Sequence, residues 1–374
     1  MSSNNIIDRY AYNFDDDPVD YDYYTKQLAL TWTDNEYKYE EDAKNFENTD
    51  ELMQRIFISI NSFFLIGDGK ISSALVGTLN STLETEGMSH CAFLAVQIAN
   101  EMVHATSYSR AARTIMGEEK LKNVLNEIST LPCILNKTNF ISEAENLDKY
   151  TLRREESSSL ISDIDILKAE PLPSLRSEND ASFQHTFQHT FQETKLSIGR
   201  KYVRLACGEG VFFVTQFALL GYFRFIGIFK NFCALNDHIF ADEMLHAKHK
   251  CYKARKSLIF EDYESAREDI RTAYKLETEF LKYILRNGVP QHHNISYEML
   301  CNFAKKRCND ISQECGLGIV FGDVNYDFPG WMQMIGGQVK NNFFEFTTNS
   351  NYKITTSDAS EKMPRVVDIN DDSF

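Results

Sequence analysis

Four long segments with apolar residues at intervals of three and four constrain the fold of this chain most. That spacing is typical of one face of an α-helix, and these segments carry most of the apolar side chains. Only 17 glycines and 7 prolines interrupt the 374 residues, which argues against an all-β fold of short strands and turns. The pattern predicts a helical bundle built from residues 51–82, 88–117, 200–232 and 233–258.

The composition excludes several classes of protein. With 43% hydrophobic and 13% aromatic residues, the chain can bury a core as one large domain or two average ones. No run approaches the roughly 18 apolar residues of a membrane span, and the N-terminus has no signal-peptide pattern. The formal charge of −15 opposes binding to nucleic acid and to anionic membranes. We therefore expect neither nucleic acid nor a membrane as a partner.

The eight cysteines are scattered without a C-x-x-C pair, which argues against a zinc knuckle and a dithiol redox motif. Several of them, such as Cys207 and Cys233, lie in apolar helical segments, where a free thiol behaves as a small hydrophobic side chain. Free thiols persist in reducing compartments, so we expect the protein in the cytoplasm.

Three segments depart from the helical pattern and suggest the domain organisation. Residues 1–24 are acidic and rich in tyrosine, which indicates an N-terminal arm that packs through aromatic side chains. Residues 146–196 contain serine- and proline-rich stretches and a repeated Phe-Gln-His-Thr, which indicates a partly disordered insertion in a helical domain of residues 25–346. Residues 347–374 are polar and acidic, as in a flexible tail.

Two Glu-x-x-His motifs, Glu101 with His104 and Glu243 with His246, are the first sign of chemistry. The i, i+3 spacing places each carboxylate and imidazole on the same helix face. Chance alone yields roughly 0.7 such motifs in a chain of this composition, so a surface pair or a hydrogen-bonded core pair stays open for either motif. Both motifs lie in apolar segments, however, where a metal ion would compensate for the burial of a carboxylate.

Two further acids, Asp68 and Glu209, stand alone among apolar residues. One carboxylate from each of two helices, with Glu-x-x-His from each of two others, is the ligand set of di-iron and di-manganese proteins with a ferritin-like bundle. Four carboxylates and two neutral imidazoles balance two divalent ions, and such ligands suit iron or manganese. The sequence thus predicts an all-α, ferritin-like bundle with a dimetal carboxylate site whose ligands are Asp68, Glu101, His104, Glu209, Glu243 and His246.

Over most of its length the sequence resembles the small (beta) subunit of class I ribonucleotide reductase. The resemblance rests on motifs that surround the predicted ligands and on an Asn-Phe-Phe-Glu signature near the C-terminus. They are Gly67-Asp68-Gly69, the segment 97–104 followed by Tyr108, Glu209-Gly210 with Phe213 and Phe217, Asp242-Glu243-Met244-Leu245-His246, and residues 341–345. Two residues depart from the pattern, since Gly208 and Ala241 stand where a larger apolar residue and an arginine are usual.

The resemblance implies a dimetal site that activates dioxygen to generate and store a tyrosyl radical on Tyr108. The metals would be two iron ions, with manganese as the alternative. Tyr108 lies two helical turns beyond Glu101, on the same face of the predicted helix. The resemblance places Phe213, Phe217 and Ile239 in an apolar pocket around the radical, although ordinary core packing would also explain them.

The resemblance also implies a route by which the radical leaves the site, from Trp32 through Asp242 to the ligand His104. On sequence grounds alone, Trp32 is equally compatible with an aromatic residue that packs two helices together.

The implied partners are a second copy of the chain, in a homodimer, and a large (alpha) subunit that reduces ribonucleotides to deoxyribonucleotides. The last residues, 368–374, alternate acids with Ile369 and Phe374 and resemble a peptide that docks on the large subunit. Tyr352 lies near the position of a tail tyrosine that relays the radical. A ferritin-like dimetal oxidase or oxygenase, or an iron-storage protein, would share the ligands and remains the alternative function.

Overall fold

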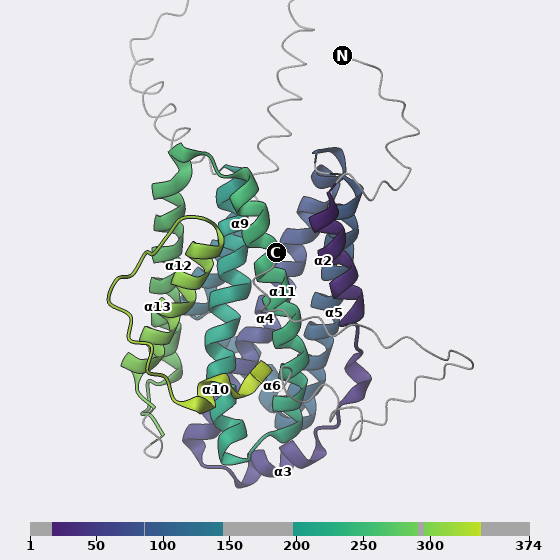
Figure 1. Ribbon diagram of the computed structural model, residues 1–374. Coiled ribbons are helices and arrows are strands. Elements are labelled where there is room, and N and C mark those ends of the chain that lie inside the picture. The colour runs from purple at the N-terminus through teal and green to yellow at the C-terminus, as the bar shows by residue number, and fades with distance from the viewer. Residues whose placement is uncertain (1–16, 86, 145–196, 291–294, 338–374) are drawn as a thin grey trace, which may run out of the picture.

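The computed structural model describes residues 17–85, 87–144, 197–290 and 295–337, and every regular element in these ranges is helical (Figure 1). The predicted all-α fold is therefore confirmed. The four predicted segments correspond to α4 (Glu51–Thr85), α5 (Met88–Met116), a continuous rod of α9 (Ile198–Cys207), η2 (Gly208–Phe213) and α10 (Val214–Ile226), and α11 (Lys230–Ser257).

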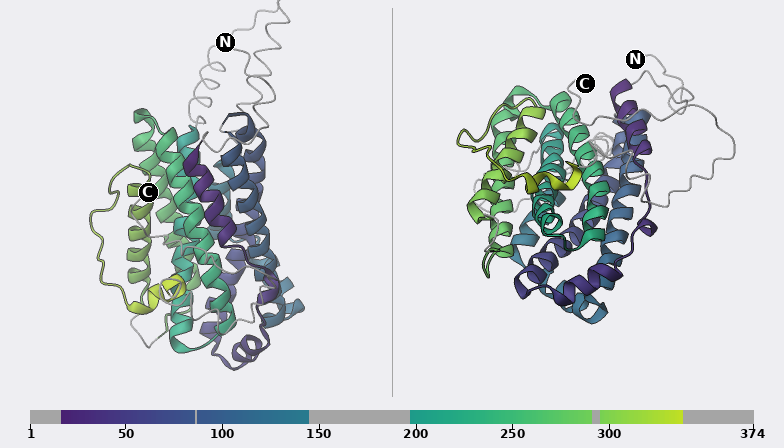
Figure 2. Two further views of the ribbon diagram at one scale, coloured as in Figure 1. Left: turned by 45° about the vertical axis from the view of Figure 1, so that its right-hand side comes forward. Right: turned by 60° about the horizontal axis from the view of Figure 1, so that its bottom comes forward.

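These four long helices run side by side along the bundle (Figures 1 and 2). Helix α4 packs against α5, and α9 packs against α11. Two further antiparallel helices, α12 (Tyr263–Ile284) and α13 (Tyr297–Glu314), pack on each other and on this rod. The remaining described elements are α2 (Pro18–Ala29), η1 (Asp34–Glu36), α3 (Glu40–Asn48), α6 (Glu118–Ile128), a helical segment at 132–144, η3 (Phe260–Asp262), η4 (Gly330–Gln333) and α14 (Met334–Gly337).

The boundary between the third and fourth segments lies at residues 227–229, not at 232–233 as the sequence pattern predicts. Gly227 ends α10 with a φ of 80°, a left-handed conformation that glycine adopts without a steric penalty. Phe229 follows with a φ of 50°, and Asp42 of α3 accepts hydrogen bonds from the N–H groups of Asn231 and Phe232 in the first turn of α11. The glycine after an apolar run was the signal for this boundary.

The first helix of the bundle begins inside the segment predicted as an arm. Asp17 caps α2 by accepting hydrogen bonds from the N–H groups of Val19 and Asp20, and proline is favoured at the next position. Tyr23 packs edge-on against Phe93 of α5. The predicted boundary at residue 24 therefore falls within α2, while the predicted insertion at 146–196 and tail at 347–374 lie outside the described residues.

The rod Ile198–Ile226 is, among the described residues, the one helix long and apolar enough to cross a membrane by length and composition. This corrects the expectation that no segment comes near that threshold. In the structure 94% of its most apolar window is buried inside the bundle, so the rod is the core helix here. All eight cysteines are free, and all but Cys133 are buried, as their apolar surroundings predict.

Candidate dimetal centre

The six side chains predicted as ligands meet in the middle of the bundle. They come from α4, α5, the η2 turn and α11, and all six are fully buried. Their ligand atoms form two overlapping groups, and within each group these atoms lie no more than 4.8 Å apart. One group is Asp68, Glu101, His104 and Glu243, and the other is Glu101, Glu209, Glu243 and His246. Glu101 and Glu243 belong to both groups, as carboxylates that bridge two metal ions would.

Each histidine faces both shared carboxylates through its Nδ1 atom. His104 Nδ1 lies 3.1 Å from Glu243 Oε1 and 3.6 Å from Glu101 Oε2. His246 Nδ1 lies 3.1 Å from Glu101 Oε1 and 3.7 Å from Glu243 Oε2. The two halves of the cluster are thus arranged alike, with one imidazole and one further carboxylate at each end.

Many polar atoms of this cluster have no hydrogen-bond partner among the described residues. They include both oxygens of Asp68 and of Glu243, one oxygen each of Glu101 and Glu209, and Nδ1 of both histidines. A buried carboxylate oxygen without a partner is strongly disfavoured, and a cluster of them fits bound cations. The residues present therefore fit a pair of metal ions with oxygen and nitrogen ligands.

The carboxylates differ in the direction of their pKa values. Burial raises the pKa values of Asp68, Glu209 and Glu243, and the nearby carboxylates add to this effect. Burial also opposes the charge on Glu101, but the imidazoles of His104 and His246 outweigh it and lower the pKa of Glu101 to about 2. Binding of metal ions would release protons from the crowded acids, since carboxylate ligands bind in their ionised form.

Local backbone features position Asp68 and Glu209, the two acids that lie outside the Glu-x-x-His motifs. A Cβ atom at Gly67 would lie 2.8 Å from the Phe213 ring, so only glycine lets α4 approach the rod next to Asp68. Glu209 lies in η2, a π-helical turn inside the rod. Such turns are rare and occur frequently at functional sites, because they change the direction in which side chains project.

Asp242 connects the cluster to Trp32. Its Oδ2 lies 3.0 Å from His104 Nε2 and accepts a hydrogen bond of 2.8 Å from Trp32 Nε1, while Oδ1 accepts one of 2.7 Å from Gln27. A carboxylate on Nε2 fixes the tautomer of His104 and leaves Nδ1 for a metal ion. The Trp32 ring also stacks on His104, with centroids 5.9 Å apart and an angle of 17° between the planes.

A second polar chain supports the other end of the cluster and was not predicted. Gln97 donates to Glu209 at 2.8 Å and to Glu101 at 3.2 Å, and its oxygen accepts a hydrogen bond of 2.6 Å from the buried ammonium group of Lys250. The spacing could have shown both residues, because Gln97 precedes Glu101 by four positions and Lys250 follows His246 by four.

Tyr108 is fully buried, and its hydroxyl donates a hydrogen bond of 2.7 Å to Asn236 Oδ1. Its ring stacks on Phe64 at 4.8 Å, and Phe64 in turn contacts Phe213 and Phe217. Phe64 and Asn236, which the sequence analysis did not single out, are thus its immediate neighbours. Burial, and next the charge of Asp68, raise the pKa of Tyr108 well above its usual range, so the phenol keeps its proton.

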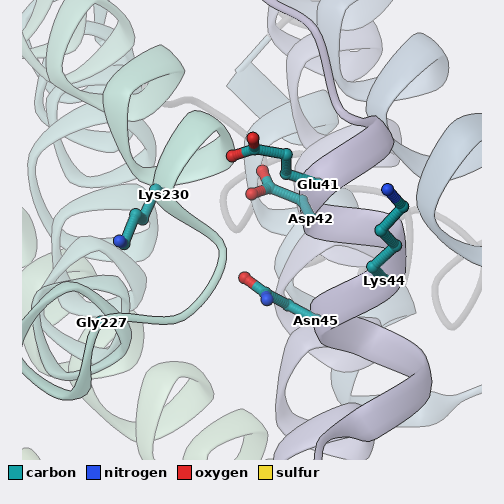
Figure 3. A pocket seen from close by; sticks show the side chains of 6 residues that line it. All are labelled: Glu41, Asp42, Lys44, Asn45, Gly227 and Lys230. Carbon is teal, nitrogen blue, oxygen red and sulfur yellow. The ribbon is translucent and has the colours of Figure 1, made fainter.

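The predicted pocket residues Phe213, Phe217 and Ile239 belong to the same hydrophobic core as Tyr108. Tyr352, the predicted relay in the tail, lies outside the described residues. A surface hollow of about 270 Å³ between α3 and the α10–α11 loop shares no residue with the dimetal cluster (Figure 3). It is lined by Glu41, Asp42, Lys44, Asn45, Gly227 and Lys230.

A long-helix bundle that brings four carboxylates and two histidines together defines a ferritin-like protein of the dimetal carboxylate class. The family model of the ribonucleotide reductase small chain matches residues 9–326, so the chain belongs to that family. The family predicted from the sequence motifs, and with it the predicted ribonucleotide reductase function, is confirmed.

Relatives of known name are distant in sequence but cover most of the chain. Human ribonucleoside-diphosphate reductase subunit M2 is 26% identical over 326 residues, which are 86% of this chain and 69% of the relative. The small chain from variola virus is 23% identical and covers 86% of this chain and 84% of its own.

Solved structures show the same fold. The dimanganese(II) protein NrdF from Streptococcus sanguinis superposes with a TM-score of 0.65 at 15% identity, over 87% of this chain and 99% of that one. A class I ribonucleotide reductase protein from Bacillus halodurans, described as putative, gives 0.65 at 18% identity, over 86% and 99%.

Proposed function

We propose that this chain, a small subunit of ribonucleoside-diphosphate reductase, generates its radical at the dimetal cluster and stores it on Tyr108. The observation that carries the proposal is the arrangement of one buried cluster of unpartnered ligand atoms, linked by Asp242 to Trp32, in the same core as a fully buried tyrosine. An iron-storage protein or a small-substrate oxidase would need the ligands, but neither the Trp32 link nor a shielded tyrosine.

Asp68, Glu101, His104 and Glu243 would hold one metal ion, and Glu101, Glu209, Glu243 and His246 the other. Bound in this way, two divalent ions, which we propose to be iron, would supply electrons to dioxygen and so the oxidising power for Tyr108. Metal analysis after loading with ferrous iron or manganese, followed by exposure to oxygen, tests both the stoichiometry and the choice of metal. Two ions per chain and a radical with iron alone are expected.

The part played by the protein around Tyr108 is to exclude water and reductants. Phe64 covers one face of the ring, and Phe213 and Phe217 lie behind it. We expect Tyr108→Phe to keep the fold and metal content, because the ring still fills the pocket, but to lose the tyrosyl signal in electron paramagnetic resonance and all nucleotide reduction. Retained reductase activity would place the radical on another residue.

Asp242 and Trp32 are proposed to carry the radical out of the site. The Trp32 N–H, the Asp242 carboxylate and His104 form a continuous hydrogen-bonded chain, which suits coupled movement of an electron and a proton. Trp32→Phe removes the indole N–H, so the Tyr108 radical should still form while turnover with the large subunit falls. Unchanged turnover would leave Trp32 with a packing role only.

Two partners complete the proposal. The acidic peptide 368–374 would dock on the large subunit, and Tyr352 would relay the radical; both lie outside the described residues. Deletion of residues 368–374 should abolish binding to the large subunit but leave the Tyr108 radical intact. Tyr352→Phe should still bind but lose activity. Full turnover by the truncated protein would reject docking through the tail.

A second copy of the chain would cover apolar side chains that α4 and α5 expose. Val76 and Met102 are 54% and 53% exposed, and Ala95 and Ala99 lie on the same open face of α5. Sedimentation at micromolar concentration should show a dimer. The eight free thiols fit the proposed cytoplasmic location.

A further inference from the structure

We propose that Asn236 is a positioning residue for Tyr108, whose amide oxygen favours the protonated phenol over the oxidised form. The inference rests on the proposed function, because it concerns the residue on which the radical would be stored. It adds a residue that sets how firmly Tyr108 holds its hydrogen atom.

The geometry defines the roles of the two amide atoms. Asn236 Oδ1 accepts the hydrogen bond of 2.7 Å from the Tyr108 hydroxyl, while Nδ2 donates one of 2.7 Å to the carbonyl oxygen of Phe232. Turning the amide over would place Oδ1 against that carbonyl oxygen, where two acceptors repel each other. The bond to Phe232 therefore keeps the acceptor side of the amide facing Tyr108.

The surroundings make this contact strong and exclusive. Tyr108 and Asn236 are both fully buried, and rings of Phe64 and Phe232 lie beside the phenol. Among the described residues, the hydroxyl makes no other hydrogen bond. A buried amide in such apolar surroundings is disfavoured unless it is bonded, so the pair of hydrogen bonds accounts for the asparagine.

Oxidation of Tyr108 removes one electron and one proton from the phenol. In the proposed reaction both would go to dioxygen, whose reduction to water takes four electrons. Two of the other three would come from the metal pair and one from a further ferrous ion in solution. An amide oxygen is too weak a base to keep the proton, so the phenoxyl oxygen would face Oδ1 with no hydrogen between them. The hydrogen bond thus stabilises only the reduced form, and Asn236 makes the stored radical a stronger oxidant than an apolar residue would.

The test replaces Asn236 by leucine, which has nearly the same shape but no acceptor. Asn61→Leu is the matched control, because Asn61 is also fully buried and its amide makes no hydrogen bond among the described residues. The first measurement uses metal-free protein and records the phenol C–O vibration of Tyr108 as the difference from Tyr108→Phe. In the wild type and in Asn61→Leu, we expect the C–O frequency of a phenol that donates a hydrogen bond. In Asn236→Leu, we expect the frequency of a phenol without a hydrogen-bond partner.

The second measurement follows the radical after loading with ferrous iron and exposure to oxygen. In deuterium oxide, the wild-type radical should show no coupling to an exchangeable hydrogen at the phenoxyl oxygen. Its reduction by hydroxylamine should become about tenfold slower in Asn236→Leu, since one neutral hydrogen bond is lost from the reduced form, and remain unchanged in Asn61→Leu.

Three outcomes would overturn the inference. An exchangeable coupling in the wild type would mean that the amide turns and donates to the radical. Equal or faster reduction in Asn236→Leu would mean that the acceptor does not favour the phenol. An unchanged phenol vibration in that variant would mean that the bond is absent. A wild type that binds two metals but forms no radical would instead reject the proposed function, and the vibration would still report on the hydrogen bond.

Discussion

Two fully buried acidic regions of this bundle differ in what compensates for their charge. At the Lys137–Glu277 pair, one carboxylate oxygen accepts a hydrogen bond of 2.8 Å from the lysine ammonium group. The other oxygen accepts a hydrogen bond of 2.5 Å from Gln216. The ammonium group also lies over the rings of Phe63 and Phe280, at 3.6 and 4.3 Å from their centroids. At the dimetal centre, four carboxylates face one another with six oxygens unpartnered.

The difference shows how a structural acid is distinguished from a ligand. A buried carboxylate that serves stability has a partner from the chain itself on each oxygen, as Glu277 has. A surplus of acids over cationic side chains, with open oxygens pointing at a common centre, stabilises the fold only when cations from solution bind. The first region should therefore respond to mutation in the same way with and without metal, and the second should not.

The largest effect on stability is expected when the buried ion pair of Lys137 and Glu277 is broken. Lys137→Met leaves the Glu277 carboxylate buried without its cation, which we expect to lower the free energy of unfolding by about 3–5 kcal/mol. Chemical denaturation of metal-free and metal-loaded protein should show the same loss. Lys122→Met, at an exposed position, is the control and should change little. A loss that appears only in the loaded protein would contradict the distinction.

The next effect is that of metal on the unpaired region. Metal at about 100 times its dissociation constant should stabilise the wild type by about 2.7 kcal/mol. Glu243→Gln should abolish most of this gain and bind fewer than two ions. Its metal-free form should be at least as stable as the wild type, because the uncharged glutamine is not repelled by the carboxylates of Glu209 and Glu101. Melting curves with and without metal decide, with the exposed Glu298→Gln as control.

Lys250 allows a smaller and more selective test, because it is the one lysine that reaches the dimetal centre through Gln97 in the described structure. Lys250→Met removes the group that orients Gln97, and we expect metal affinity to fall about tenfold, as for other residues that support ligands. Titration with metal at fixed pH measures this change. An affinity within twofold of the wild type would show that Gln97 is held without Lys250.

The same variant carries a pH signature. Burial lowers the pKa of Lys250 to about 8, although the charges of Glu209 and Glu101 oppose the shift. The unfolded chain then binds more protons than the folded one between pH 8 and the usual lysine value near 10.5, so this group makes the metal-free protein more stable as pH rises through that range. In Lys250→Met, the melting temperature of the metal-free protein should not show this rise between pH 8 and the usual lysine value.

The smallest effect concerns Asp17, an acid paired with lysine at the edge of the bundle. Its burial is outweighed by the hydrogen bond from Lys256, which lowers the pKa of Asp17 to about 2. This contribution is complete above the usual value of 3.8 and is lost as pH falls towards 2. Asp17→Asn still caps α2. A plot of melting temperature against pH should therefore become flatter only in this acidic range. Asp50→Asn, which also alters an acid bonded to a helix start, is the control.

The sequence predicted the four long helices, because apolar repeats within single segments mark them. It also predicted that the six ligand-type side chains meet, because acids and Glu-x-x-His pairs in apolar segments match the ligand set of ferritin-like dimetal proteins. Contacts between distant helices were harder to foresee. Phe64 and Asn236 reach Tyr108 from α4 and α11, and nothing in their own segments marks them. Pairing of Lys137 with Glu277, 140 positions apart, could not be told from a surface charge without knowing which helix faces meet.

The start of α2 shows a different limit of sequence reasoning. Acidic and aromatic composition indicated an arm, but His249 and Lys253 on α11 bond the buried Asp20 at 2.8 and 3.0 Å, which makes the segment part of the bundle. Composition describes a segment alone, whereas its docking depends on groups more than 200 residues away.

The π-helical turn at Gly208–Phe213 has a consequence for chain length. A π turn holds one residue more than an α turn, so the faces of α10 are rotated by about 100° from those of an uninterrupted helix. Aligned with the rod, a regular helix therefore needs a one-residue gap beside Glu209. Deleting Gly210 would close that gap, but it would bring Val211 to a position where a Cβ lies 2.5 Å from Ile311 Cδ1. An insertion or deletion here should thus be among the least tolerated in the described chain.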